Sequence, residues 1–158
     1  MHPALNKAIL LVLLLASPWL LVQAFIFVAA QDEAITSMET CPEGSANCAH
    51  LGGNADYRMD TTSTILDQSM DDVRIKILDY ILEYECNILD EQSTESTYYV
   101  HFVEYTPFWQ FPDDVLISIE VIDDDTVEIE LHSQSRIGLG DMGVNPERLE
   151  RVYDELSA

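Results

Sequence analysis

An uncharged apolar run near the N-terminus, AILLVLLLASPWLLVQAFIFVAA, occupies residues 8–30 and limits where the chain can reside. A helix rises about 1.5 Å per residue, so a run of this length spans roughly 30 Å, the thickness of the hydrocarbon core of a bilayer. Lys7 precedes the run, and Asp32 and Glu33 follow it. Because basic residues are enriched on the cytoplasmic side of a membrane span, we predict a single-pass anchor. Residues 1–7 would form a cytoplasmic stub, and the rest of the chain would lie outside.

A cleaved signal peptide is the alternative interpretation of this run. The triplets ending at Ala24 and Ala30 contain the small residues found at signal-peptide cleavage sites, and cleavage there would give a secreted protein. However, the run is longer than the roughly 7 to 15 apolar residues of a signal peptide. We therefore favour an uncleaved signal-anchor helix over residues 8–30, which places the protein in the cell membrane.

The remainder of the chain, from Gln31 onward, is strongly acidic. It carries 29 Asp and Glu against six Lys and Arg, a net charge of −23. Such a charge repels nucleic acid, so we expect no nucleic-acid partner. The acidic residues alternate with apolar ones in periodic patterns, which is typical of a folded domain rather than a disordered tail. We interpret the acidity as a halophile-type surface, in which salt screens the mutual repulsion; calcium binding is the less favoured alternative.

The first two cysteines bracket the segment CPEGSANC, whose Pro, Gly and Asn favour tight turns. Cys41 and Cys48 can therefore meet in a disulfide outside the cytoplasm. A metal site would add His50 and Cys86 to this pair, but six residues between the cysteines is not the usual zinc spacing. We predict the disulfide and no metal, and we expect Cys86 to be an unpaired, buried residue of a helix.

Hydrophobic periodicity predicts one α+β domain over residues 41–158, after a polar spacer at residues 31–40. Ser69 and Asp72 approximate a capping box at the start of a helix, and Asn145 followed by Pro146 has the residue types preferred at a helix start. The predicted helices cover residues 70–85 and 146 onward, and the predicted strands cover residues 57–60, 97–105, 115–122 and 126–132. Residues 90–96 are read as a polar loop, and His132 as facing solvent. We expect an antiparallel sheet of three to four strands that packs two amphipathic helices on one face.

The segment GLGDMG, residues 138–143, has the spacing of a dinucleotide-binding loop. In a dinucleotide fold this loop opens directly into a helix, and a second parallel strand follows. Here we predict that the helix begins only after Asn145, that too little chain follows for the second half of the unit, and that Asp141 would repel a pyrophosphate. We therefore expect no nucleotide and no other cofactor, and we read the glycines as turn positions.

The segments CPEGSANC, YVHFVEYTPFWQFPDDV and SQSRIGLGDMGVNPERLE together resemble the uncharacterised family known as domain of unknown function 1499, over most of the chain from Cys41. Ala46 departs from the family pattern, which has Pro there, and Ala49 and His50 replace a Val-Ser stretch. The resemblance implies an exported or membrane-tethered protein without an established activity. It rests on Cys41, Cys48, Tyr99, His101, Asp113, Asp114, Ser135, Arg136, Gly138, Asp141, Gly143, Asn145 and Arg148.

The polar residues within these segments are the candidate site. They are His101, Asp113, Asp114, Arg136, Asp141, Asn145 and Arg148. They form either a cleft that recognises a protein partner or a small ligand, or a structural network, because an Arg can hold carboxylates in a fixed geometry. In the structural interpretation, Arg136 and Asp141 form an internal salt bridge, and His101 belongs to the core side or to a second layer of its strand.

A hydrolase is the competing functional hypothesis. His101 would be the general base, oriented by Asp113 or Asp114. The nucleophile candidates near these segments are Ser133, Ser135 and Cys86. No serine lies in a nucleophile-elbow motif, and the expected disulfide removes two of the three thiols. We therefore assign no catalytic residue and favour a binding or structural protein of the cell envelope.

Overall fold

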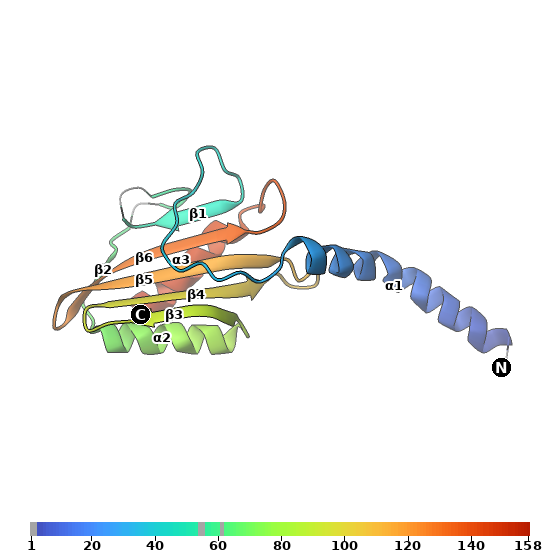
Figure 1. Ribbon diagram of the computed structural model, residues 1–158, viewed down its shortest axis with the longest axis horizontal. Helices are drawn as coiled ribbons and strands as arrows, with labels where there is room; N and C mark the ends of the chain where they lie inside the picture. Colours follow the sequence, from blue (N-terminus) through green and yellow to red (C-terminus); the bar gives the residue numbers. More distant parts are fainter. Residues whose placement is uncertain (1–2, 54–55, 61) are drawn as a thin grey trace.

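A computed structural model describes residues 3–53, 56–60 and 62–158 of the protein. In Figure 1 a long helix, α1 (Pro3–Ala29), projects away from one end of an α+β domain. Within α1, residues Asn6–Ala29 have a mean hydropathy of 2.4 and are long and apolar enough to cross a membrane, as signal sequences also are. The predicted apolar helix is thus present, and its side chains are largely uncovered by the rest of the chain.

Pro18 lies inside α1 and has no N–H, so the carbonyl of Leu14 loses its helical donor. The Ser17 hydroxyl donates to this carbonyl at 2.8 Å and replaces the missing bond. In an apolar medium an unpaired backbone carbonyl would be costly, so this local bond makes the proline compatible with a membrane span.

The described residues contain one antiparallel sheet of six strands, and the α+β prediction is confirmed although three to four strands were expected. The spatial order is β1-β6-β5-β4-β3, and β2 also pairs with β6. The strands are β1 (Cys48–Leu51), β2 (Ile65–Leu66), β3 (Asn87–Ser93), β4 (Thr97–Tyr105), β5 (Pro112–Asp123) and β6 (Thr126–Ser135). The predicted strands at 97–105, 115–122 and 126–132 correspond to β4, β5 and β6.

The strands that the sequence did not predict lie at the two edges of the sheet. The predicted loop at residues 90–96 begins inside β3, whose side chains are mostly exposed, so its sequence lacks the alternation of a half-buried strand. Strands β1 and β2 are only four and two residues long. The strand predicted at residues 57–60 is reduced to a single bridge between Tyr57 and His50.

Helices α2 (Met70–Glu83) and α3 (Val144–Ser157) pack against one face of the sheet and against each other. The Ser69 side chain accepts a hydrogen bond from the Asp72 N–H at 3.3 Å, as the capping box predicted. The Asp72 carboxylate accepts the Ser69 hydroxyl in place of the Ser69 backbone N–H that a capping box uses. The core between the helices and the sheet includes Val73, Ile77, Tyr80, Val100, Phe102, Ile117, Ile129, Leu131, Leu149, Val152 and Leu156.

Two predicted helix ends are wrong. Helix α2 stops at Glu83, two residues before the expected end, and Glu85 has a positive φ of 51°. Cys86 therefore follows the helix instead of lying in it, and it is half-buried with a free thiol. Helix α3 begins directly after Gly143, whose φ of 92° glycine adopts without strain, and Asn145 does not cap it.

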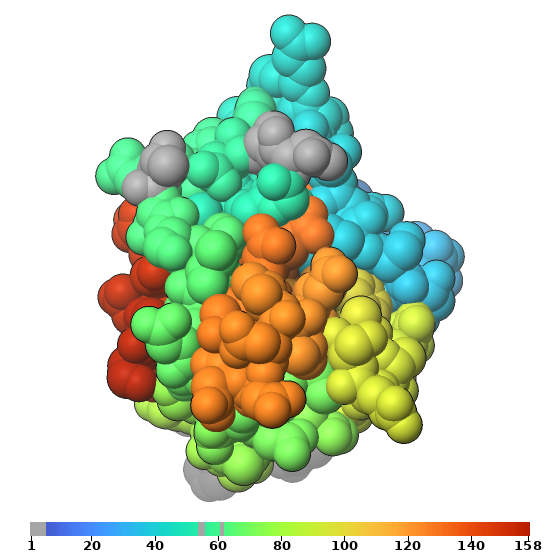
Figure 2. All heavy atoms as spheres, turned by 90° about the vertical axis from the view of Figure 1, so that its left-hand side faces the viewer, coloured from blue at the N-terminus to red at the C-terminus, as the bar shows by residue number. Residues whose placement is uncertain are grey.

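The opposite face of the sheet is crossed by residues 31–40, the expected polar spacer, which we call the covering segment. In Figure 1 it runs from the end of α1 across the strands toward β1. Figure 2 views the domain from the hairpin end, with α3 in red on one side of the orange sheet strands and the chain around residue 40 in cyan on the other. The sheet thus has a different cover on each face, and polar side chains of both faces are shielded from water.

Candidate functional site

The predicted polar set is divided between the two faces of the sheet. Successive residues of a strand point to opposite faces, so the adjacent Asp113 and Asp114 of β5 cannot serve one site. Asp114 meets His101 and Arg136 beneath the covering segment. Asp113 meets Arg148 beneath α3. We call the first group the outer network and the second the inner network.

In the outer network, the imidazole of His101 is fully buried and bonded at both nitrogens. Its Nε2 lies 2.7 Å from Asp114 Oδ1, and its Nδ1 accepts the backbone N–H of Ile35 at 3.0 Å. Because Nδ1 is an acceptor, the ring proton is placed on Nε2, which donates to the carboxylate. The Ile35 N–H therefore occupies the Nδ1 lone pair that His101 would need to act as a general base.

Arg136 holds Asp114 through two of its nitrogens. Nε and Nη2 donate to the Asp114 carboxylate at 2.9 and 2.7 Å, and Nη1 donates to Asp32 at 2.6 Å. Burial by itself raises the pKa of Asp114, but the hydrogen bonds from His101 and Arg136 outweigh it and lower that pKa. The pKa of Arg136 is raised, because its bonds to Asp114 and Asp32 outweigh the opposing effect of burial. The outer network is therefore an ion pair that also bonds the covering segment.

Further bonds hold the covering segment to the edge of the sheet. The Tyr99 hydroxyl donates to the carbonyls of Ile35 and Ser37 at 2.8 and 3.3 Å. The amide of Gln92 donates to the Thr36 carbonyl at 3.0 Å. Tyr99 and His101 share one face of β4, as their alternation predicted, and that face is occupied by the chain itself.

The inner network is centred on Arg148, which is 1% exposed and comes from α3. Its Nη2 donates to Asp113 at 2.7 Å, and its Nη1 donates to Asn145 and Ser133 at 2.9 and 3.1 Å. Its Nε lies 3.1 Å from Glu104 Oε1 but without hydrogen-bond geometry, so that contact is an ion pair only. A charge in the interior is tolerated where it is paired in this way.

Glu104 of β4 joins both helices to the sheet. Its carboxylate accepts the Tyr80 hydroxyl of α2 and Nη2 of Arg151 of α3, each at 2.7 Å. Burial, and then the charge of Glu104, raise the pKa of Tyr80, which keeps the hydroxyl protonated as the donor. Two helices and a central strand are thereby linked through one carboxylate.

Asp141 pairs with Arg58 and not with Arg136, so the predicted salt bridge is wrong. Nη1 and Nη2 of Arg58 donate to the two carboxylate oxygens at 2.9 and 2.8 Å. Burial alone raises the pKa of Asp141, but the bonds from Arg58, the Gly143 amide and Asn145 outweigh it and lower that pKa to about 2. The resulting stabilisation is present above the ordinary pKa of an Asp, and it is lost as the pH falls through about 2.

Asn145 connects this ion pair to Arg148. Its side-chain N–H groups lie at hydrogen-bond distance from Asp141 Oδ2 at 2.8 Å, and its side-chain oxygen accepts the Ser133 hydroxyl at 2.6 Å and Arg148 at 2.9 Å. The same N–H groups also reach Asn47 O and Ser135 Oγ. The inner network consists of Arg58, Glu104, Asp113, Ser133, Asp141, Asn145, Arg148 and Arg151.

Asp141 also occupies the N-terminus of α3, where a dinucleotide loop would bind phosphate. The amides of Gly143 and Asn145 donate to its carboxylate at 2.9 and 3.3 Å. The expectation that the helix would not open directly from the glycine loop is wrong, since α3 begins at Val144. The neighbouring strands are antiparallel, however, so the parallel unit that accompanies a dinucleotide loop is not formed by β5 and β6.

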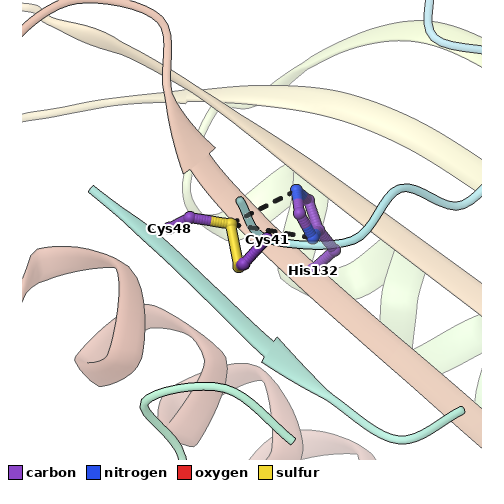
Figure 3. Close-up of side chains that lie close together, drawn as sticks. All are labelled: Cys41, Cys48 and His132. Atoms are coloured by element: carbon purple, nitrogen blue, oxygen red, sulfur yellow. Dashed lines mark hydrogen bonds between the residues drawn. A yellow bond between two sulfur atoms is a disulfide. The ribbon is translucent and has the colours of Figure 1, made fainter. Parts of the chain in front are cut away.

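Near β1, a disulfide joins Cys41 to Cys48, and His132 lies against it (Figure 3). His132 Nε2 is 3.7 Å from Cys48 Sγ, and the Nδ1 atoms of His132 and His50 are 3.3 Å apart. Burial, and then the proximity of His50, lower the pKa of His132 to about 4, so this ring is neutral near pH 7. His132 points away from the helices but is 1% exposed, so the expectation that it faces solvent is wrong.

Metal-ligating atoms gather at the same place. The ligand atoms of Cys41, Cys48 and His132 lie within 4.8 Å of one another. Because the two sulfurs are bonded to each other, neither offers the thiolate that a metal requires. Cys86 precedes β3, at the opposite edge of the sheet from β1, so the alternative ligand set with His50 and Cys86 is not assembled.

The comparison with known families agrees with the resemblance in the sequence. The family model described as "Protein of unknown function (DUF1499)" matches residues 30–156. The chain belongs to the DUF1499 family. A search of curated proteins finds no match.

The hydrolase nucleophiles do not lie beside His101 in this DUF1499 domain. The hydroxyl of Ser133 donates to Asn145 in the inner network, and Ser135 shares its face of β6. Burial raises the pKa of the Cys86 thiol to about 12, so the thiol is a poor nucleophile. Asp114 orients His101, whereas Asp113 lies on the other face of the sheet.

Sequence reasoning missed Arg58, Glu104 and Arg151 of the inner network, and it named Ser133 only as a candidate nucleophile. Arg58 lies in a stretch rich in Gly, Asn and Asp, where the sequence predicted a short strand at residues 57–60 but no polar site. A usable signal was the scarcity of basic residues in an acidic chain. Each of the five arginines forms a salt bridge in the described structure: Arg58, Arg74, Arg136, Arg148 and Arg151.

Proposed function

We propose that this DUF1499 protein is a membrane-tethered, extracytoplasmic domain with a structural or binding role. The observation that carries the proposal is the burial and internal bonding of the polar residues shared with the family pattern. Arg136 is half-buried, and the charged groups of the set are bonded within the chain; the buried members are His101, Asp113, Asp114, Asp141, Asn145 and Arg148. Such an arrangement stabilises a fold, whereas a catalytic site needs a base with a free lone pair next to a nucleophile.

The hydrolase alternative receives less support from the geometry. His101 is fully buried, and its acceptor nitrogen already binds the Ile35 amide. A shallow polar depression of about 440 Å³ opens beside Asp114 and Arg136, and Glu33 and Gln134 contribute to its lining. In the proposed role, a protein partner or a small polar ligand binds to the domain surface, and the outer network supports that surface from below.

The orientation of the protein is testable by cysteine labelling in intact cells. In a Cys86→Ala background, Ser96→Cys is expected to react with a membrane-impermeant maleimide, because residue 96 is exposed in the turn between β3 and β4. His2→Cys is expected to react only after permeabilisation. The protein extracted from the membrane is expected to have the mass of a chain that retains residues 1–30. The reverse labelling pattern, or a mass that lacks these residues, would contradict the single-pass orientation.

We further propose that the acidic surface is an adaptation to high salt. A net charge of −22 on the whole chain opposes the compact state, and dissolved ions screen this repulsion. The thermal unfolding temperature is therefore expected to rise steadily with potassium chloride. A control variant, Glu95→Gln with Asp124→Asn and Asp125→Asn, removes three exposed charges. It is expected to reach a given unfolding temperature at a lower concentration of potassium chloride than the unaltered protein. Equal salt responses of the two proteins would contradict the proposal.

A further inference from the structure

The loop between β4 and β5, residues 106–111, has the sequence TPFWQF and carries no charge in a strongly acidic domain. Phe108 is 70% exposed and Trp109 is 39% exposed. Large aromatic side chains gathered at one exposed loop are typical of a surface that contacts another apolar phase. We call these residues the aromatic loop.

The aromatic loop is bonded to α1 and not only to its own strands. Nε1 of Trp19 donates to the Phe108 carbonyl, and Nε2 of Gln23 donates to the Trp109 carbonyl, each at 2.8 Å. Trp19 and Gln23 lie about six to ten residues before Ala29, which corresponds to roughly 9 to 15 Å along the helix. In Figure 1 the loop lies beside the last turns of α1.

These two bonds explain polar side chains that are otherwise anomalous in an apolar span. A side-chain amide such as that of Gln23 is costly in hydrocarbon unless it is paired, and it often marks a contact with another segment. The aromatic loop supplies the acceptors, and in return its carbonyls are satisfied. Irregular backbone enters hydrocarbon only where its polar groups are paired in this way.

Other polar groups of the loop are paired within it. The Thr106 amide donates to the Phe111 carbonyl at 2.9 Å, and the Gln110 amide donates to the Thr106 carbonyl at 3.0 Å. The Phe111 amide donates to the Thr106 hydroxyl at 2.9 Å. Phe108 and Gln110 have positive φ values of 62° and 56°, which cost energy for residues other than glycine. The loop therefore holds a defined shape that exposes Phe108.

Three acidic residues near the strand ends and the groove beside the loop are paired with arginines. Asp113 pairs with Arg148, Glu104 with Arg151, and Asp32 with Arg136. Between α1 and the loop lies an open groove of about 1040 Å³ with a largely apolar lining. Residues that line it include Trp19, Ala24, Phe27, Tyr105, Phe108 and Pro112.

We infer that the aromatic loop is immersed in the outer leaflet of the membrane and that lipid acyl chains fill the groove. The inference rests on the proposed function, because α1 must be retained as a membrane span. It adds a second membrane contact that fixes the orientation of the domain, with the β4–β5 end of the sheet at the bilayer. A domain held only by a flexible linker would have no such preferred orientation.

The test uses the full chain with Cys86→Ala, reconstituted into phosphatidylcholine vesicles, and a nitroxide label at Phe108→Cys. Collisions with oxygen, which concentrates in lipid, are compared with collisions with a neutral nickel chelate, which stays in water. The same label is placed at Leu15→Cys in α1 and at Asp124→Cys in the β5–β6 turn, which are both exposed within the chain. The ratio of oxygen collisions to nickel-chelate collisions at position 108 is expected to equal the ratio at position 15. Both ratios are expected to be several-fold above the ratio at position 124.

The three positions separate failure of the inference from failure of the anchor. If position 15 is in lipid while position 108 matches position 124, the loop lies in water and the inference is wrong. If position 15 is itself accessible to the nickel chelate, α1 does not span the bilayer and the proposed function fails first. A Gln23→Leu variant removes one loop bond and is expected to increase the mobility of the label at position 108, but not that at position 124. Unchanged mobility at position 108 would contradict the contact between the loop and α1.

Discussion

Replacing Arg148 by Met is expected to destabilise the domain by about 3–5 kcal/mol, the cost of breaking a buried ion pair. The substitution keeps much of the side-chain volume but leaves the buried Asp113 carboxylate without its 2.7 Å partner. It also removes a donor to Asn145 and to Ser133. Urea unfolding of the full chain in detergent micelles, followed by near-ultraviolet circular dichroism, measures the change.

The matched control is Arg74→Met, because Arg74 forms a single exposed ion pair with Glu91 on the surface of the domain. Exposed ion pairs contribute little to stability, so Arg74→Met is expected to change the urea midpoint of unfolding far less than Arg148→Met does. A second variant, Arg148→Met with Asp113→Leu, removes both buried charges and is expected to recover part of the loss. If Arg148→Met unfolds at the same urea concentration as Arg74→Met, the inner network does not hold the fold together.

Replacing Asp114 by Ala is expected to cost about 2–4 kcal/mol and to release the covering segment from the sheet. The change leaves His101 Nε2 and the Nε and Nη2 atoms of Arg136 without their acceptor, and both side chains are largely buried. His101 also holds the Ile35 amide, so a displaced imidazole would expose that amide to solvent. The expected result is lower stability together with faster hydrogen exchange in residues 31–40.

Hydrogen exchange read by mass spectrometry distinguishes this local effect from general loosening. Asp124→Ala, in the exposed β5–β6 turn, is the matched loss of one carboxylate and is expected to leave exchange in residues 31–40 unchanged. A peptide covering α3 serves as an internal reference. If hydrogen exchange in residues 31–40 of the Asp114→Ala variant is as slow as in the unaltered protein, the outer network does not fasten this segment.

The sequence predicted elements well where the pattern is local. The apolar run forms α1, the segment with Val73, Ile77 and Ile81 at helical spacing forms α2, and the segment 97–105, rich in aromatic and β-branched residues, forms β4. It failed at the sheet edges, because β3 is mostly exposed and has no apolar face to mark it. The start of α3 was misplaced because Gly143, with a positive φ, precedes the helix, while the expected cap Asn145 is used inside the inner network.

The polar residues show the same division between local and long-range information. Their identities were readable in the segments around residues 101, 113 and 141, and the family match covers them. Their partners were not readable, because Arg58 is far in sequence from Asp141 and Asp32 is far from Arg136. An ion pair leaves no periodic trace in the sequence, and pairs of this separation are set by which strands and loops become neighbours.

Hydropathy was enough to predict the long apolar helix, periodicity was enough to predict the α+β class of the acidic domain, and three sequence segments were enough to indicate its family. Folding alone settled that Asp113 and Asp114 serve opposite faces, that residues 31–40 cover the outer network, and that the aromatic loop contacts α1. The physical reason is that burial and periodicity are properties of short stretches. The partners of a buried charge or of an exposed aromatic loop instead depend on distances between segments that only the folded chain brings together.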